Sequence, residues 1–237
     1  MQGCCKVSSS ICEARWALFD NQLGNEIGSF SDPFDAENAI EAGWTTGLVP
    51  FTYENGIGFI ENMSAFETNF RFATQFGNLF AEAQEGEVYE VSIDGRVLDP
   101  IEGSRHEIIL SGSKSFHLYR EYESDTESRV EFSDFSGGSV PTIRTTLIDS
   151  DPLSEWKTLS IQLRVDTVGL TNFGGIVFNF GLSSVVRIAL DDNELDLSGF
   201  DTSEYGFGGC TSFFNINASV PGGTRAEVDN FRIEKIN

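Results

Sequence analysis

The sequence contains no run of 18 apolar residues, so it offers no candidate for a transmembrane helix. Its first twenty residues, MQGCCKVSSSICEARWALFD, also lack the apolar segment of a signal peptide. We therefore expect either that a leader has been removed or that the protein is assembled inside a cell, as a virion component would be.

Basic residues are scarce: 15 Lys and Arg stand against 37 Asp and Glu, which gives a formal net charge of −22. Binding to phosphate backbones or to anionic bilayers draws its affinity from Lys and Arg, so we expect neither nucleic acid nor a membrane as a partner. Such acidity suits a chain that stays soluble in a salty or calcium-rich medium through self-repulsion. The expected location is extracellular, or the surface of a cell or virion.

Cysteine is also sparse, and its spacing matches no motif. Cys4, Cys5 and Cys12 lie near the N-terminus and Cys210 lies alone. This pattern is neither a two-pair zinc spacing nor a dense disulfide framework. Disulfides that tie the N-terminal segment to Cys210, free buried thiols and a metal site all remain open.

Complete catalytic motifs are missing. No G-x-S-x-G, phosphate-loop or H-E-x-x-H motif occurs. The segment NELDLSG resembles the strand that carries the two catalytic glutamates of laminarinase-type hydrolases. Glu194 and Asp196 are present, but Gly199 stands where the second glutamate is required.

A resemblance to alginate lyases is equally incomplete. The segments FHLYREY and SRVEF resemble two of their strands, but the Gln-x-His motif is missing. Because successive residues of a strand face opposite sides, His117 and Tyr119 can share a face and Arg120 cannot join them. We therefore expect no enzymatic activity, with a polysaccharide lyase or glycoside hydrolase as the least favoured alternative.

What the sequence does contain favours β-structure. It has 21 Phe and 24 Gly, a composition that suits pleated sheets and tight turns. Apolar residues alternate with polar ones in many short segments, most cleanly at Leu159, Ile161, Leu163 and Val165. The further segments with this pattern are 66–76, 89–93, 106–110, 116–118, 130–132, 174–181, 184–190, 212–220 and 225–233.

These segments predict an all-β fold, a two-sheet antiparallel β-sandwich of the jelly-roll kind, because each strand has one apolar face that needs a partner sheet. Only residues 35–43, DAENAIEAG, are typical of a helix. Residues 28–237 are expected to form the sandwich domain. Residues 1–27 are expected to be an N-terminal extension that docks on another surface.

Two strand segments change their periodicity at acidic residues. In RAEVDNFRIEKIN the apolar positions are Ala226 and Val228 before Asp229 and the opposite parity, Phe231 and Ile233, after it. A similar change follows Asp191 in VVRIALDDNELDL. Such a change predicts a β-bulge, which re-aims side chains and frees backbone oxygens.

Several segments resemble carbohydrate-binding jelly rolls. DPFDAENAIEAGW, GEVYEVSIDGRV, EWKTLSIQLRV and FNFGLSSVVRIALDDNEL are similar in order to segments of the galactose-binding-like, family 4/9-type carbohydrate-binding modules, over residues 28–197. The last segment, AEVDNFRIEKI, resembles the final strand of concanavalin-like, laminin-G-type sandwiches. Both resemblances imply a two-sheet sandwich that binds glycans.

The resemblance also implies a structural calcium ion where the first strands meet the last. Oxygen ligands for it would come from Asp191 or Asp229 facing Asp32, Asp35 or Glu37. The alternative is that Asp and Asn occupy these positions because they tolerate the backbone angles of turns and bulges.

Sugar binding in such folds combines an aromatic platform with polar side chains that bind the hydroxyl groups. The candidate platforms are Tyr53, Tyr119, Tyr122 and Tyr205, and the candidate polar partners are Arg120, Gln162 and Asn179. The function expected from the sequence is that of a non-catalytic module for carbohydrate binding or surface adhesion, with a polysaccharide or glycan as its partner. The alternative is a structural subunit of an extracellular filament or a virion, capsid or tail, that forms homo-oligomers or filaments through its N-terminal segment.

Overall fold

The computed structural model describes residues 30–32, 45–46, 52–54, 57–61, 68–75, 84–111, 115–134, 143–173, 176–203, 205–208, 213–220 and 222–237. These residues form strands and turns and no helix, which confirms the all-β prediction. Among them there is accordingly no helix long and apolar enough to cross a membrane. The predicted helix at 35–43 and the extension at 1–27 lie outside this part of the chain.

The larger sheet, sheet A, has nine antiparallel strands. They are β1 (Phe30–Asp32), β3 (Thr52–Glu54), β4 (Ile57–Glu61), β6 (Val88–Leu98), β11 (Lys157–Phe173), β12 (Ile176–Leu190), β13 (Asn193–Glu194), β14 (Tyr205–Gly208) and β16 (Arg225–Lys235). The order across the sheet is β13-β12-β11-β6-β16-β4-β3, with β1 paired to β16 and β14 to β12.

The smaller sheet, sheet B, has seven antiparallel strands. They are β2 (Thr45–Thr46), β5 (Thr68–Gln75), β7 (Arg105–Ser111), β8 (Ser115–Ser124), β9 (Glu127–Asp134), β10 (Ile143–Asp149) and β15 (Phe213–Val220). Their order is β10-β9-β8-β7-β15-β5-β2. The chain passes from sheet B to sheet A through residues 150–156, between β10 and β11.

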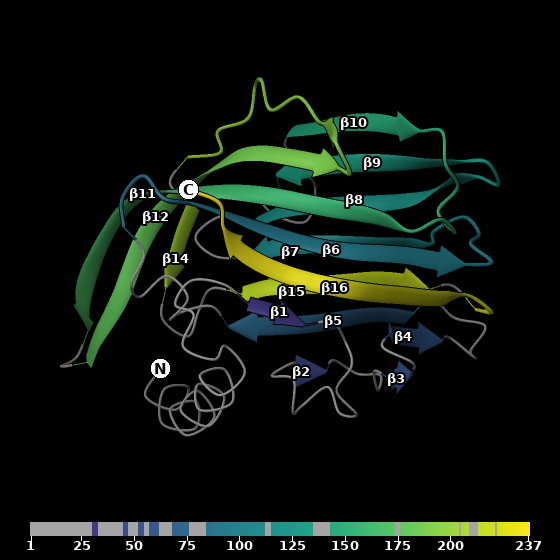
Figure 1. Cartoon of the computed structure of the whole chain (residues 1–237), viewed down its shortest axis with the longest axis horizontal. Coiled ribbons are helices and arrows are strands. Elements are labelled where there is room, and N and C mark those ends of the chain that lie inside the picture. Colours follow the sequence, from purple (N-terminus) through teal and green to yellow (C-terminus); the bar gives the residue numbers. More distant parts are fainter. Residues whose placement is uncertain are drawn as a thin grey trace.

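The two sheets lie one over the other, with β6 and β16 of sheet A in front of β7 and β15 of sheet B (Figure 1). The predicted alternation along β11 is confirmed, because Leu159, Ile161 and Val165 are fully buried. From sheet B, Phe116 and Leu118 are buried against them. Each such side chain contributes about 1.5–3 kcal/mol by leaving water, so this layer is what holds the sandwich together.

The periodicity change in the last strand is a β-bulge, as predicted. The pairing of β16 with β6 shifts its register between Asp229 and Arg232, and Asn230 has a φ of 49°. Val228 lies opposite Gly95 before the shift, and Ile233 lies opposite Val91 after it. Since positions 91 and 95 have the same parity on β6, the extra residue keeps the apolar positions of β16 on one face.

The second periodicity change has a different cause. Asp191 and Asp192 form a two-residue turn, because Leu190 of β12 pairs directly with Asn193 of β13. Asp191 has a φ of 50°, in the left-handed region that Asp and Asn tolerate better than most residues. The sequence-based prediction of a bulge at this position is therefore corrected to a tight turn.

A close approach between the sheets depends on one glycine. A Cβ atom at Gly95 of β6 would lie 2.8 Å from Nδ1 of His106 on β7. His106 is buried between the sheets, and burial lowers its pKa to about 3, with the charge of Arg120 lowering it further. The imidazole is therefore neutral in the folded protein above that pH.

Replacing Gly95 with alanine should therefore destabilise the fold. We expect G95A to lower the free energy of unfolding by about 1–3 kcal/mol, because the buried imidazole has to move out of a well-packed layer. The control is G169A, since a Cβ at Gly169 meets no atom within 4 Å. Urea unfolding midpoints measure both variants, and equal midpoints for G95A and the wild type would contradict the packing described above.

Candidate functional site

A set of polar side chains covers the outer face of sheet B. On β7, β8 and β9 the even-numbered residues form the core, and the odd-numbered ones face away from sheet A. The strand register places Glu107, Tyr119 and Glu131 side by side across the three strands. Neighbouring strands are about 4.8 Å apart, so the Cα atoms of the two glutamates are separated by roughly 10 Å.

Glu131 is 2% exposed and is held by three neighbours. Its carboxylate accepts hydrogen bonds from the Tyr119 hydroxyl and, at 2.5 Å, from the Ser133 hydroxyl. Nη1 of Arg144 lies 3.9 Å from its other oxygen. Burial raises the pKa of Tyr119 above its usual range, and the hydrogen bond and charge of Glu131 raise it further, so this phenol remains protonated.

Glu107 is 1% exposed and occupies the matching position on the other side of Tyr119. Its Oε2 lies 3.2 Å from Nδ1 of His117, and its Oε1 lies 3.7 Å from Nη2 of Arg105. The guanidinium of Arg105 is also 5.4 Å from the centre of the Tyr119 ring, within cation–π range. The other ring nitrogen of His117 is 3.3 Å from the Ser115 hydroxyl.

These residues form a two-layer arrangement that we call the sheet B cluster. Its members are Arg105, Glu107, His117, Tyr119, Glu131, Ser133 and Arg144. The glutamates form the lower, buried layer, whereas His117 is 21%, Arg105 36% and Arg144 64% exposed. The buried carboxylates fix the orientation of groups that reach the surface, which is how a preorganised polar site is built.

Only one residue of the sugar site predicted from the sequence belongs to this cluster. Tyr119 does, and it shares its face with His117, as the strand periodicity predicted. Tyr122 lies at the hairpin between β8 and β9, where its hydroxyl donates to Asp125 at 2.9 Å. Gln162 lies on sheet A, where it donates to Glu90 at 2.8 Å.

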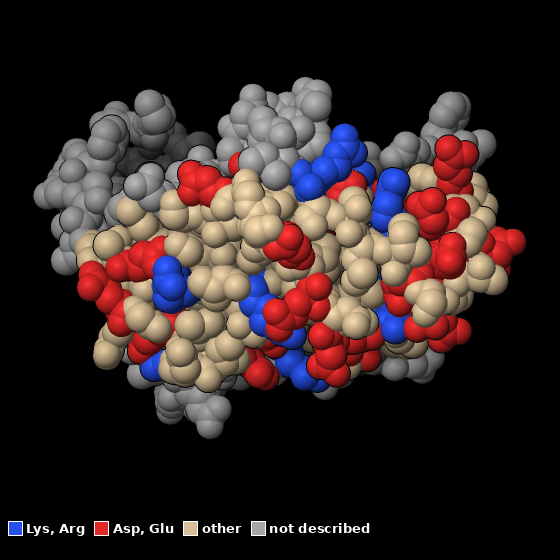
Figure 2. Space-filling view, turned by 90° about the horizontal axis from the view of Figure 1, so that it is seen from above, with Lys and Arg blue, Asp and Glu red and all other residues tan. Residues whose placement is uncertain are grey.

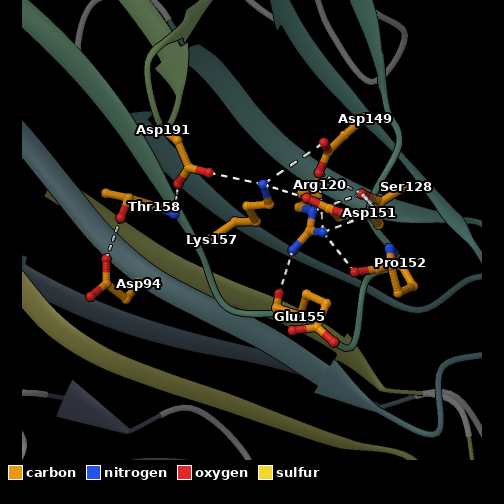
Figure 3. A network of polar contacts seen from close by, with 10 residues as sticks. All are labelled: Asp94, Arg120, Ser128, Asp149, Asp151, Pro152, Glu155, Lys157, Thr158 and Asp191. Atoms are coloured by element: carbon orange, nitrogen blue, oxygen red, sulfur yellow. Dashed lines mark hydrogen bonds and ion pairs between the residues drawn. The ribbon is translucent and has the colours of Figure 1, made fainter.

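The structure corrects the assignment of Arg120 to a sugar site. Arg120 is fully buried on the inner face of sheet B, where its guanidinium contacts groups of the protein itself (Figure 3). Its guanidinium donates to the carbonyl oxygens of Pro152 and Glu155 at 2.7 Å and to that of Asp151 at 3.3 Å. It also donates to Ser128 at 2.7 Å and to Asp149 at 3.2 Å.

For several remaining predicted residues the structure describes no side chains. Tyr53, Asn179, Tyr205 and Asp32 lie in β3, β12, β14 and β1, and their side chains are outside the described part. Asp35 and Glu37 lie outside the described residues altogether.

Asp191 is engaged by donors of the chain itself. Its Oδ1 accepts from the Thr158 amide at 2.9 Å, and its Oδ2 is 3.0 Å from Nζ of Lys157. The same ammonium lies 2.7 Å from Asp151 and 4.0 Å from Asp149 (Figure 3). Lys157 therefore supplies the positive charge among these carboxylates, and calcium binding by Asp191 is not supported.

In the part of the chain that the structure describes, the surroundings of Asp229 do not show a calcium site either. It lies opposite Asp94 in the pairing of β16 with β6. Asp94 accepts from Thr158 at 2.5 Å and from the Asn230 amide group at 2.9 Å. Within the described ranges no group of three or more His, Cys, Asp or Glu side chains could hold a metal ion.

Comparison with known proteins gives no family. No family model matches the chain, and no curated protein matches its sequence. Solved structures do share the fold. The potassium-bound carbohydrate recognition domain of Emp46p is 10% identical, with a TM-score of 0.53, and the match covers 89% of this chain and 97% of that one.

Two further matches are enzymes. The Crh5 transglycosylase is 14% identical, with a TM-score of 0.53, over 89% of this chain and 85% of that one. An endo-acting O-glycanase from the human gut microbiota, associated with mucin breakdown, is 12% identical, with a TM-score of 0.54, over 88% of this chain and 99% of that one. At these identities the matches show the fold alone.

These matches correct one expectation and leave another unconfirmed. The expectation that the protein is not an enzyme is overturned as an inference from this fold, because the same sandwich carries transglycosylase and glycanase domains as well as a carbohydrate recognition domain. The fold of carbohydrate-recognition domains is shown, but the family 4/9-type assignment is not. A related fold is known with bound potassium, whereas calcium is not shown here.

Removing the Arg120 guanidinium should destabilise the protein strongly. We expect R120M to lower the free energy of unfolding by about 3–5 kcal/mol, because the buried carboxylate of Asp149 loses its nearest cation and three buried carbonyl oxygens lose their donor. The matched control is R164M, since Arg164 is 50% exposed and forms an ion pair with Asp166. If R120M unfolds at the same denaturant concentration as R164M, Arg120 does not hold the 150–156 connection.

Replacing Asp229 should stabilise the protein near neutral pH. Burial raises the pKa of Asp229, and the negative charge of Asp94, which lies opposite it, raises that pKa further. Ionisation is therefore unfavourable in the folded state, and its cost is fully present above the folded pKa and disappears as the pH falls below the unfolded value, about 3.9. We expect D229N to unfold at higher urea concentration than the wild type at pH 7, by about 0.2–1 kcal/mol.

The pH dependence provides the control for this variant. At pH 3 the difference between D229N and the wild type should vanish, because both side chains are then neutral. A stabilisation that is equal at pH 3 and pH 7 would show that like-charge repulsion is not its cause.

Proposed function

We propose that this protein binds glycans on the outer face of sheet B, through the sheet B cluster. The observation that carries the proposal is the burial of Glu107 and Glu131 beneath side chains that reach the surface. Polar donors that reach the surface in fixed orientations suit a ligand rich in hydroxyl groups.

The chemistry of the accessible groups suits a carbohydrate. The His117 ring can donate or accept, and Arg105 and Arg144 offer guanidinium donors in fixed orientations. The carboxylates beneath them limit their rotation, so less entropy is lost when a sugar binds. The fold shared with the carbohydrate recognition domain of Emp46p supports this function.

A second candidate function is the cleavage or transfer of glycosidic bonds. It is favoured by the presence of two carboxylates, Glu107 and Glu131, on one face of the sheet, because glycosidases use such a pair as acid and nucleophile or base. The Cα separation of roughly 10 Å allows the carboxyl groups to approach the distances that both stereochemical outcomes need. The Crh5 transglycosylase and the O-glycanase share the fold.

Binding of a glycan array, followed by calorimetry with the best ligand, tests the proposed function. We expect H117A to weaken binding about 10-fold, the effect of losing one hydrogen bond of 1–1.5 kcal/mol. Y119F should also weaken it, because Glu131 loses one of its two hydroxyl donors. The control is Q162A on sheet A, which should bind like the wild type.

The outcomes separate the two faces and the two functions. Loss of binding in Q162A with full binding in H117A would place the site on sheet A and contradict the proposal.

For the second candidate, the wild type should release or transfer sugars from β-glucan or mucin O-glycans, and E107Q and E131Q should lose this turnover while keeping their melting temperatures. An absence of turnover in the wild type on both substrates would reject the second candidate.

A further inference from the structure

The outer face of sheet B carries three exposed arginines in this acidic chain. Acidic side chains are spread over the surface in Figure 2, in keeping with the net charge of −22. On the outer face of sheet B, three glutamates of β7, β8 and β9 each have an arginine partner, and Glu123 lies 3.8 Å from Arg129 as well. The pairs are Glu107 with Arg105, Glu121 with Arg129, and Glu131 with Arg144.

The two signs of charge lie at different depths. The side chains of Glu107, Glu131 and Glu121 are 1%, 2% and 16% exposed, whereas those of Arg105, Arg129 and Arg144 are 36%, 41% and 64% exposed. The formal charges of these six residues cancel, and among the six a ligand that arrives from solvent meets the guanidinium groups first. Beside Arg129 the carboxylate of Glu123 is 40% exposed, so the layering is clearest at Arg105 and Arg144. Because Coulomb energy falls with distance, the nearer cations outweigh the carboxylates beneath them.

The arginines are also distributed over several strands. Arg105, Glu121 and Arg129 lie in one row across β7, β8 and β9, and Arg144 on β10 lies opposite Ser133 of β9. Strand spacing of about 4.8 Å places the Cα atoms of Arg105 and Arg129 roughly 10 Å apart. Guanidinium groups bind carboxylate and sulfate oxygens with paired hydrogen bonds, so successive acidic groups of one chain can each bind a different arginine.

We propose that the ligand of this face is an acidic glycan, with carboxylate or sulfate groups bound by Arg105, Arg129 and Arg144. This inference rests on the proposed glycan-binding function and specifies its substrate class. The long-range repulsion from the net charge of −22 is screened beyond about 8 Å at physiological salt, so the local cations decide the contact.

The test compares matched ligands by calorimetry on the full chain at about 0.15 M salt, where screening is effective. The probes are neutral dextran, dextran sulfate for the sulfate source, and alginate oligosaccharides for the carboxylate source. We expect at least one acidic probe to bind 10-fold or more tightly than dextran. R129Q should weaken acidic binding about 10-fold and leave neutral binding within twofold, since Arg129 lies outside the sheet B cluster and its side chain is 41% exposed. R144Q should also weaken acidic binding about 10-fold.

The control is R164Q, which removes the same charge from an exposed, ion-paired arginine on sheet A. Equal losses in R164Q and R144Q would show general electrostatics rather than a site, and would overturn the inference. Equal binding of neutral and acidic probes would overturn it while the glycan-binding function stands. Binding of a single-stranded oligonucleotide as tightly as the acidic glycans would also overturn it, and binding of no glycan at all would remove the proposed function itself.

Discussion

The buried guanidinium of Arg120 is the interaction on which much of this structure depends. It joins three main-chain carbonyl oxygens of the 150–156 connection to Ser128 and Asp149 of sheet B. That connection carries the chain from one sheet to the other. Leu153 within it is fully buried, and its carbonyl oxygen accepts a hydrogen bond from the amide of Val97 on sheet A. A charge without these partners could not remain in the core, so the connection and the packing of the sheets require each other.

The fold was predictable wherever one face of a strand is consistently apolar. The alternation along β11 and the parity change in β16 both follow from side chains that must face one core. The bulge at Asn230 keeps the apolar positions of β16 on that face. The segments 174–181 and 184–190 were predicted as separate strands but form one long β12, because pairing with β11 continues across them. β10, an edge strand with the sequence IRTTLID, carries too weak a pattern to predict.

The candidate site was harder to predict, because a sequence shows the parity of a residue but not its depth. Tyr119 and His117 could be placed on one face from periodicity alone, and Arg120 on the other. Glu107 and Glu131 were missed because a charged residue in a strand is normally exposed, and their burial depends on arginine and tyrosine partners from neighbouring strands. The signal that was available is the repeated placement of charged residues at odd positions of three consecutive strands.

Buried glutamates with arginine partners occur on both sheets, and the exposure of those arginines differs between the sheets. On sheet A, Glu227 accepts from Arg96 and Arg225 at 2.7 Å, and those guanidinium groups lie against the rings of Trp156 and Phe59, so they are only 27% and 24% exposed. On sheet B, Arg129 and Arg144 extend further into solvent. The arginines around Glu227 are thus packed against aromatic rings, whereas those around the buried glutamates of sheet B present donors to solvent, which is why we propose ligand binding on sheet B.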